Sequence, residues 1–121
     1  MANQFVWVDI PVTDLDRAIA FYSAVLEAPV KREEFPGGVC IGVLPHVGDN
    51  VSGCLFISET VQPSAHGPLV YLNCQDRLDA ALAAVEPNGG KIIQGKESIG
   101  PYGWRALILD SEGNRLALHS T

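Results

Sequence analysis

The segment from Phe5 to Tyr22 changes its hydrophobic periodicity in the middle. Up to Val12, apolar residues recur at every second position, which is typical of a β-strand with two different faces. Beyond Thr13 they recur at the i, i+3, i+4 and i+7 positions of an amphipathic helix, which must end before Pro29. We therefore expect a strand followed by a helix that Thr13 caps. The apolar stripe of this helix consists of Leu15, Ala18, Ile19 and Tyr22.

The same pattern occurs a second time in residues 69–93. A strand-like run ends at Asp76, which can cap a second helix, and Pro87 with the glycines after it ends that helix. Three short strand-like runs follow each helix, separated by turns rich in Gly, Pro and Asn. These runs lie at 30–34, 39–44 and 53–58 in the first half, and at 91–95, 105–109 and 115–119 in the second half. The apolar stripe of the second helix consists of Leu78, Ala81, Leu82 and Val85.

This repetition predicts a single α+β domain that is made of two tandem βαβββ modules. The first module spans about residues 1–60, a linker covers about 59–68, and the second module spans about 69–121. Half of a chain this short cannot bury both faces of its own sheet. We therefore expect the two modules to form an open, curved mixed sheet around a cavity, with both helices on the outside.

Charge is sparse in this chain, with 18% charged residues and a formal net charge of −6 among 121 residues. Because there is no cluster of Lys and Arg and no apolar run of membrane-spanning length, we expect neither nucleic acid nor a membrane as a partner. The first ten residues show no export signal. The three cysteines, Cys40, Cys54 and Cys74, are far apart in apolar surroundings, which favours buried reduced thiols in a cytoplasmic protein over a zinc site.

The first strand has an unusual second face. Alternation places Val8 on the face that packs against the helix, so Trp7 and Asp9 point to the other face, toward the cavity. The indole of Trp7 either fills the cavity or offers a stacking surface to a ligand. The carboxylate of Asp9 either forms an ion pair with Arg105 or Arg115, which we favour, or takes part in catalysis.

Three segments resemble the vicinal oxygen chelate superfamily, which includes glyoxalase I, bleomycin-binding proteins and extradiol dioxygenases. They are residues 10–22 (IPVTDLDRAIAFY), residues 67–90, and residues 108–120 (ILDSEGNRLALHS), where Ser111 replaces a proline of the superfamily pattern. The resemblance covers the whole chain in order. It implies two βαβββ modules, a small organic molecule as a partner, and a homodimer.

Metal enzymes of this superfamily use up to four inward-facing His, Glu or Gln ligands from the first and last strands of each module. Matching the two modules by strand alternation and matching them by their helix caps disagree by one residue, so we expect a bulge before the second helix. Apolar side chains cannot bind Zn²⁺, Fe²⁺ or Mn²⁺, so we expect no metal and no cofactor. The four places fall on Trp7, on Leu55 or Phe56, on Leu69 or Val70, and on Ala117.

We therefore predict a metal-independent protein that binds a planar or anionic organic ligand between aromatic walls. No residue is assigned a catalytic role, and His119 is expected at the dimer surface rather than in catalysis. One alternative is a metal-dependent lyase, isomerase or dioxygenase with atypical ligands such as Asp9, His119 and Tyr71. Another is a structural or regulatory dimer without a ligand. The residues expected to line the cavity are Trp7, Asp9, Leu69, Tyr71, Asn73, Tyr102, Trp104, Arg105, Arg115, Ala117 and His119.

Overall fold

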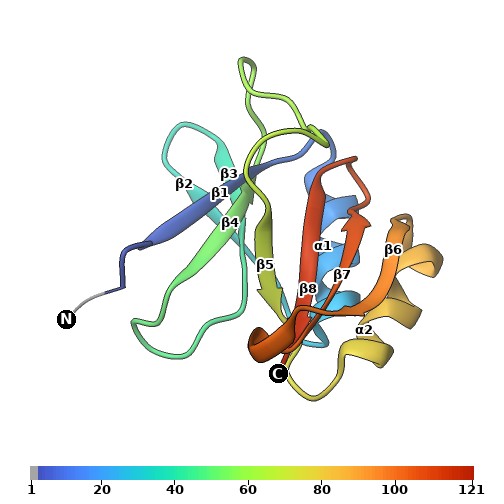
Figure 1. Ribbon diagram of the computed structural model, residues 1–121. Coiled ribbons are helices and arrows are strands. Elements are labelled where there is room, and N and C mark those ends of the chain that lie inside the picture. The colour runs from blue at the N-terminus through green and yellow to red at the C-terminus, as the bar shows by residue number, and fades with distance from the viewer. Residues whose placement is uncertain (1–2) are drawn as a thin grey trace.

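The computed structural model describes residues 3–121 and has one βαβββ module in each half of the chain (Figure 1). The first module comprises β1 (Trp7–Pro11), α1 (Leu15–Leu26), β2 (Lys31–Phe35), β3 (Val39–Val43) and β4 (Ser52–Phe56). The second comprises β5 (Val70–Asn73), α2 (Leu78–Val85), β6 (Lys91–Ser98), β7 (Trp104–Leu109) and β8 (Arg115–Ser120), with the 3₁₀ turns η1 (Glu86–Asn88) and η2 (Gly100–Tyr102). The predicted α+β fold is thus confirmed. Within residues 3–121, neither helix is long and apolar enough to cross a membrane.

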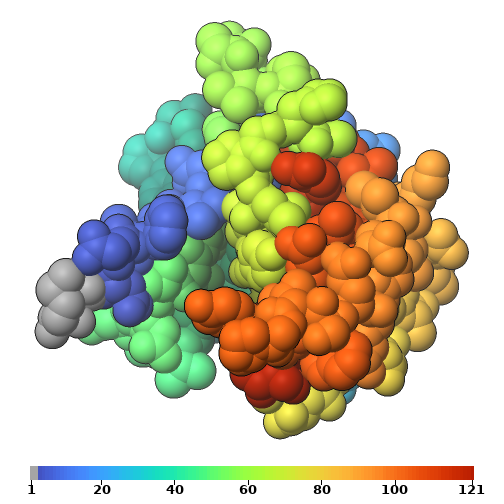
Figure 2. Space-filling model, in the orientation of Figure 1, coloured from blue at the N-terminus to red at the C-terminus, as the bar shows by residue number. Residues whose placement is uncertain are grey.

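Each module forms its own four-stranded mixed sheet, in which the first strand pairs in parallel with the last. The strand orders are β1-β4-β3-β2 and β5-β8-β7-β6, and the remaining pairs are antiparallel. Both β1 and β5 are therefore edge strands, and the expected open sheet consists of two parts that share no strand pairing within the described residues. The surface shows the same division, with the first module in blue to green beside the second in yellow to red (Figure 2).

The two modules share one hydrophobic core, which lies between the helices and one face of each sheet. The helices α1 and α2 also contact each other, so the core is continuous from one module to the next. The opposite face of each sheet, called the outer face below, stays accessible: Trp7 of β1 is 43% exposed and Tyr71 of β5 is 45% exposed. Large side chains of the core include those of Ile10, Phe21, Tyr22, Leu55, Leu78, Val85, Ile108, Leu116 and Leu118.

The two helices begin one residue later than the sequence predicted. Asp14, not Thr13, caps α1, with its side chain accepting a 3.0 Å hydrogen bond from the Arg17 backbone N–H. Arg77 occupies the same place before α2 without a side-chain cap, because Asp76 adopts a left-handed conformation with φ 63°. That left-handed turn adds one residue between strand and helix in the second module, which explains why the two ways of matching the modules disagree.

Strand pairing shows that the two modules correspond as strand alternation predicted, and not as their helix caps suggested. The backbone N–H of Val12 donates to the carbonyl of Phe56 at 2.8 Å, and that of Cys74 donates to the carbonyl of His119 at 2.8 Å. In each module, the residue after the first strand thus binds the last strand in the same way. Val12 therefore corresponds to Cys74, and Trp7 corresponds to Leu69.

A carboxylate from the second module completes the N-terminus of α1. Oε1 of Glu112, in the β7–β8 turn, accepts hydrogen bonds from the backbone N–H groups of Thr13 (3.0 Å) and Asp14 (2.9 Å). Its Oε2 forms an ion pair with Arg17 Nε at 2.7 Å. A negative charge here satisfies free N–H groups and interacts favourably with the helix dipole. Glu112 therefore fastens the last hairpin of the second module to the first helix.

A buried polar network supports the same junction. The hydroxyl of Tyr22 on α1 donates to Asp110 Oδ2 at 2.5 Å, and Asn114 Nδ2 donates to the same oxygen at 2.9 Å and to the Pro11 carbonyl at 2.8 Å. Burial and the neighbouring carboxylate raise the pKa of Tyr22 well above its usual value, so its hydroxyl stays a donor. These bonds join α1, β1 and the β7–β8 turn.

Replacing Glu112 by Gln is expected to lower the free energy of unfolding at pH 7 by about 2 kcal/mol. Burial alone would raise the pKa of Glu112, but hydrogen bonds from Arg17, Asp14 and Thr13 lower it to about 2. A carboxyl with a lowered pKa stabilises the fold above its unfolded pKa of about 4.3, and that contribution is lost as the pH falls toward 2. Urea unfolding at several pH values between 7 and 2.5 measures both effects.

The matched control is Glu34→Gln, because Glu34 is exposed and its ion pair with Arg32 is long, at 3.9 Å. It should change the free energy of unfolding by no more than about 0.5 kcal/mol. The Glu112→Gln protein should also lose less stability than the wild type between pH 5 and pH 2.5. Equal stability of wild type and Glu112→Gln at pH 7, with the same loss in acid, would contradict the proposed role of Glu112.

Candidate functional site

The outer face of β1 presents an indole and a carboxylate that bind each other. The indole Nε1 of Trp7 donates a hydrogen bond of 2.9 Å to Asp9 Oδ1. The thiol of Cys54 on β4 donates to the same oxygen at 3.3 Å, since Asp9 and Cys54 are paired across the two strands. We call these three residues the Trp7 cluster. Ile10, on the other face of β1, is only 4% exposed, so the predicted alternation of the strand is confirmed.

The Trp7 cluster holds Asp9 in one orientation. Burial is the main cause that raises the pKa of Cys54 to about 11; the hydrogen bond to Asp9 also raises it, whereas Trp7 acts in the opposite direction. The thiol is therefore protonated at neutral pH and acts as a donor, not as a nucleophile. Both donors bind Oδ1 of Asp9, and no group within residues 3–121 donates to Oδ2. That oxygen and the exposed face of the indole are available to a ligand.

A second group of predicted site residues lies on the outer face of the other sheet. The hydroxyl of Tyr71 accepts a 2.5 Å hydrogen bond from Arg105 Nη1, and Arg105 Nε also contacts Glu97 at 3.0 Å. The ring of His119 lies 6.1 Å from the Tyr71 ring in an edge-on arrangement, and His119 Nε2 is 2.6 Å from the Tyr102 carbonyl oxygen. We call Tyr71, Arg105 and His119 the Tyr71 cluster; it is aromatic and polar, with the charge of Arg105 paired to Glu97, whereas the Trp7 cluster is aromatic and acidic.

The structure corrects two further expectations, the place of Trp104 and the ion pair of Asp9. Trp104 precedes Arg105 in β7, so alternation places it on the α2 side of the sheet, where Lys96 Nζ lies 5.3 Å from the indole centroid. Arg115 donates to a linker carbonyl at 2.9 Å. Asp9 pairs with Trp7 and Cys54 rather than with either arginine, so the expected ion pair is wrong.

Backbone pairing also corrects one of the four places that correspond to metal ligands. Asp9 pairs with Cys54 in the first module, and Tyr71 pairs with Ala117 in the second. Because Asp9 and Tyr71 are equivalent, Cys54 is the counterpart of Ala117. The residues predicted for this place, Leu55 or Phe56, are therefore wrong. The apolar surroundings of Cys54 correctly indicated a buried thiol, but the parallel register that brings it to Asp9 is not visible in the sequence.

The four corresponding places do not offer a transition-metal donor set. Trp7, Leu69 and Ala117 have no side-chain ligand atom, and Cys54 alone can bind a metal. No group of three or more His, Cys, Asp or Glu side chains suited to a metal ion occurs in residues 3–121. Of the atypical set, Tyr71 and His119 lie together in the second sheet, whereas Asp9 belongs to the first sheet.

Comparison with known proteins identifies the family of this chain. The family model described as the Glyoxalase/Bleomycin resistance protein/Dioxygenase superfamily matches residues 4–118. The chain belongs to this superfamily. A "Glyoxylase-like domain-containing protein" from Didymella fabae is 30% identical over 130 residues, covering 96% of this chain and 92% of the relative.

Solved structures of the same superfamily share the fold. A glyoxalase/bleomycin resistance protein from Albidiferax ferrireducens T118 has a TM-score of 0.77 at 21% identity, over 98% of this chain and 100% of that one. Glyoxalase I from Zea mays has a TM-score of 0.70 at 21% identity, over 93% of this chain and 44% of that one. The fosfomycin resistance protein FosX from Listeria monocytogenes has a TM-score of 0.70 at 12% identity, over 100% and 95%.

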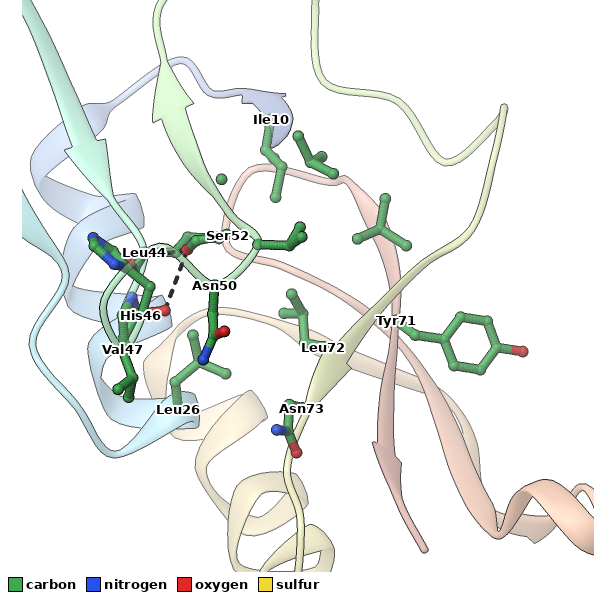
Figure 3. A pocket seen from close by; sticks show the side chains of 15 residues that line it. Ile10, Leu26, Leu44, His46, Val47, Asn50, Ser52, Tyr71, Leu72 and Asn73 are labelled. Atoms are coloured by element: carbon green, nitrogen blue, oxygen red, sulfur yellow. Dashed lines mark hydrogen bonds between the residues drawn. The ribbon is translucent and has the colours of Figure 1, made fainter. Parts of the chain in front are cut away.

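This superfamily member also contains a cavity of about 490 Å³ at the seam between its modules (Figure 3). The sequence did not predict this seam cavity, and of the predicted site residues only Tyr71 and Asn73 line it. Figure 3 shows that the phenol of Tyr71 points away from it, so Tyr71 contributes mainly its backbone. Its walls come from the helix-facing side of β1 and β5, the end of α1 and the β3–β4 loop.

Proposed function

We propose that this protein binds a planar or anionic organic molecule on its outer sheet faces, without a metal ion. The observation on which this rests is the half-exposed indole of Trp7, held in place by Asp9. An aromatic face that is fixed by a hydrogen bond stacks on a planar ligand with little loss of conformational entropy. The free Oδ2 of Asp9 accepts a hydrogen bond from the same ligand, and the guanidinium of Arg105, although paired with Glu97, keeps N–H donors for an acidic group on it.

The proposal of metal independence rests on the donor set. Three of the four corresponding places lack a ligand atom, and the thiol of Cys54 is engaged with Asp9 at 3.3 Å. Two neighbouring donors, Asp9 and Cys54, give a weak site unless a third joins them. Binding energy in this member therefore comes from stacking and hydrogen bonds.

Replacing Trp7 by Ala is expected to weaken the binding of 6-hydroxy-2-naphthoate at least tenfold. This probe is planar, with a hydroxyl that can donate to Asp9 and a carboxylate. Loss of a stacking surface costs on the order of 1.4 kcal/mol, which corresponds to a tenfold change in Kd. Isothermal titration calorimetry measures the change, and circular dichroism verifies that the variant is folded.

Trp104→Ala is the matched control, because Trp104 has the same 43% exposure as Trp7 and lies on the α2 side of the other sheet. It should bind the probe as the wild type does. A Trp7→Phe variant should retain most of the affinity, since a flat ring remains. If Trp7→Ala binds the probe normally while Trp104→Ala does not, the site is misplaced.

We also propose that the protein is a homodimer. The outer face of the first sheet carries exposed apolar side chains at both ends: Trp7 of β1 at one end, and Phe35 (46% exposed) paired with Val39 (56% exposed) at the other. Several large apolar side chains left uncovered on one face of a sheet favour an interface or a ligand site there. A second copy that covers both outer faces would also shield the Trp7 and Tyr71 clusters from water, which strengthens their hydrogen bonds.

Light scattering is expected to give twice the chain mass of 13.0 kDa at micromolar concentration. Val39→Glu should shift the mass toward that of one chain, because it places a charge on the uncovered face. Val61→Glu, a substitution at a linker residue that is 52% exposed, is the control and should not change the mass. A single-chain mass for the wild type across a broad concentration range would refute the dimer.

A further inference from the structure

The seam cavity is separate from the Trp7 cluster. Val8 lies on β1 between Trp7 and Asp9, but its side chain points to the opposite face and lines the cavity. Val70 and Leu72 do the same on β5. A ligand in the seam cavity and a ligand on the outer face would therefore lie on opposite sides of the same two edge strands.

The walls of the seam cavity are incompletely covered apolar side chains. Val8, Leu26, Val70 and Leu72 pack against the core but are only partly buried. They belong to different modules, whose sheets share no strand pairing in the described residues, so the gap between the sheets stays open. A ligand that filled it would remove apolar surface of both modules from water. The volume of about 490 Å³ falls within the usual size of small-molecule sites.

The lining excludes a charged ligand. None of its residues is an Asp, Glu, Lys or Arg. The titratable residues among them are His46 and Tyr71; the phenol of Tyr71 points away from the cavity (Figure 3), and Nδ1 of His46 is already 2.9 Å from the Gly48 carbonyl oxygen. Placing a carboxylate or an ammonium against these walls would cost its hydration without a counter-charge.

One end of the cavity offers hydrogen bonding. Asn50 in the β3–β4 loop extends its amide into the cavity (Figure 3). Ser52 lies beside it, but its hydroxyl already donates to the Leu44 carbonyl at 3.1 Å. Within residues 3–121 the Asn50 amide forms no side-chain hydrogen bond with the protein, so it can bind one polar group of a ligand.

We propose that the seam cavity is a second ligand site, which takes a neutral, mainly aliphatic molecule with one hydroxyl or carbonyl group. The apolar body would lie against Val8, Leu26, Val70 and Leu72, and the polar group would bind the Asn50 amide. This inference does not depend on the proposed function of the outer face, since no residue of the Trp7 cluster lines the cavity.

The test compares 1-octanol with octanoate, which have the same chain length and differ in charge. Titration calorimetry and displacement of the neutral fluorophore N-phenyl-1-naphthylamine give the affinities. We expect 1-octanol to bind at least tenfold more tightly than octanoate at pH 7. An octanoate affinity equal to or above that of 1-octanol would overturn the proposal, because the walls would then tolerate an anion.

Two variants locate the site. Leu72→Phe fills the cavity and should weaken 1-octanol binding at least tenfold, while 6-hydroxy-2-naphthoate binding stays unchanged. Asn50→Leu removes the polar contact and should weaken 1-octanol binding about fivefold. The affinity for N-phenyl-1-naphthylamine should not fall. Val61→Phe, in the linker, is the control for added volume. Because Asn50 is exposed, its substitution also serves if Leu72→Phe fails to fold.

The remaining outcomes also decide the question. If 1-octanol binds but neither Leu72→Phe nor Asn50→Leu weakens it, the site lies elsewhere and the proposal is wrong. If the wild type binds no 1-octanol and Leu72→Phe changes the mass in light scattering, a second copy of the chain covers the seam instead. Loss of naphthoate binding in Trp7→Ala with normal 1-octanol binding would show that the two sites are independent.

Discussion

The contact between Glu112 and the start of α1 joins the two halves of this protein. One carboxylate from the β7–β8 turn satisfies two backbone N–H groups of the first module and pairs with Arg17. The buried Tyr22–Asp110 bond lies directly behind it. With the turn fixed there, the helices of both modules pack into one core, which neither half could form alone. The relative position of the two sheets follows from this junction, since within residues 3–121 no strand of one sheet pairs with a strand of the other.

That arrangement leaves two kinds of surface for ligands. The helices cover one face of each sheet, so the aromatic residues on the other face are not needed to fill the core. Trp7 and Tyr71 stand at equivalent edges of the two sheets, each held by a charged neighbour. The separation of the sheets leaves the seam cavity as a second hollow, built from core-facing residues such as Val8 and Leu72. The outer faces carry charged side chains and the seam cavity carries none of Asp, Glu, Lys or Arg, which is why we propose different ligands for them.

The sequence predicted the features that depend on local periodicity. The two βαβββ modules, the alternation of the first strand and the extra residue before α2 all follow from spacings of a few positions. Contacts between distant segments could not be predicted in this way. Glu112 is close to Thr13 only after both modules have packed, and Cys54 meets Asp9 only through the parallel register of β1 and β4. Trp104 and Arg105 were both expected to line the cavity, although strand alternation places them on opposite faces. The seam cavity depends on how the two sheets are placed next to each other, which cannot be predicted from any single segment.

The proposal that the outer-face site binds no metal can be tested directly by elemental analysis of protein that is purified without an affinity tag. With Trp7, Leu69 and Ala117 at three of the four corresponding places, Zn, Fe, Mn and Ni should each be present at far less than one atom per chain after dialysis. The contrary result would be one tightly held metal atom per chain that survives dialysis against a chelator. If that atom were also lost in Asp9→Ala or Cys54→Ser, these two residues would be metal ligands and the protein a metal-dependent member of its superfamily.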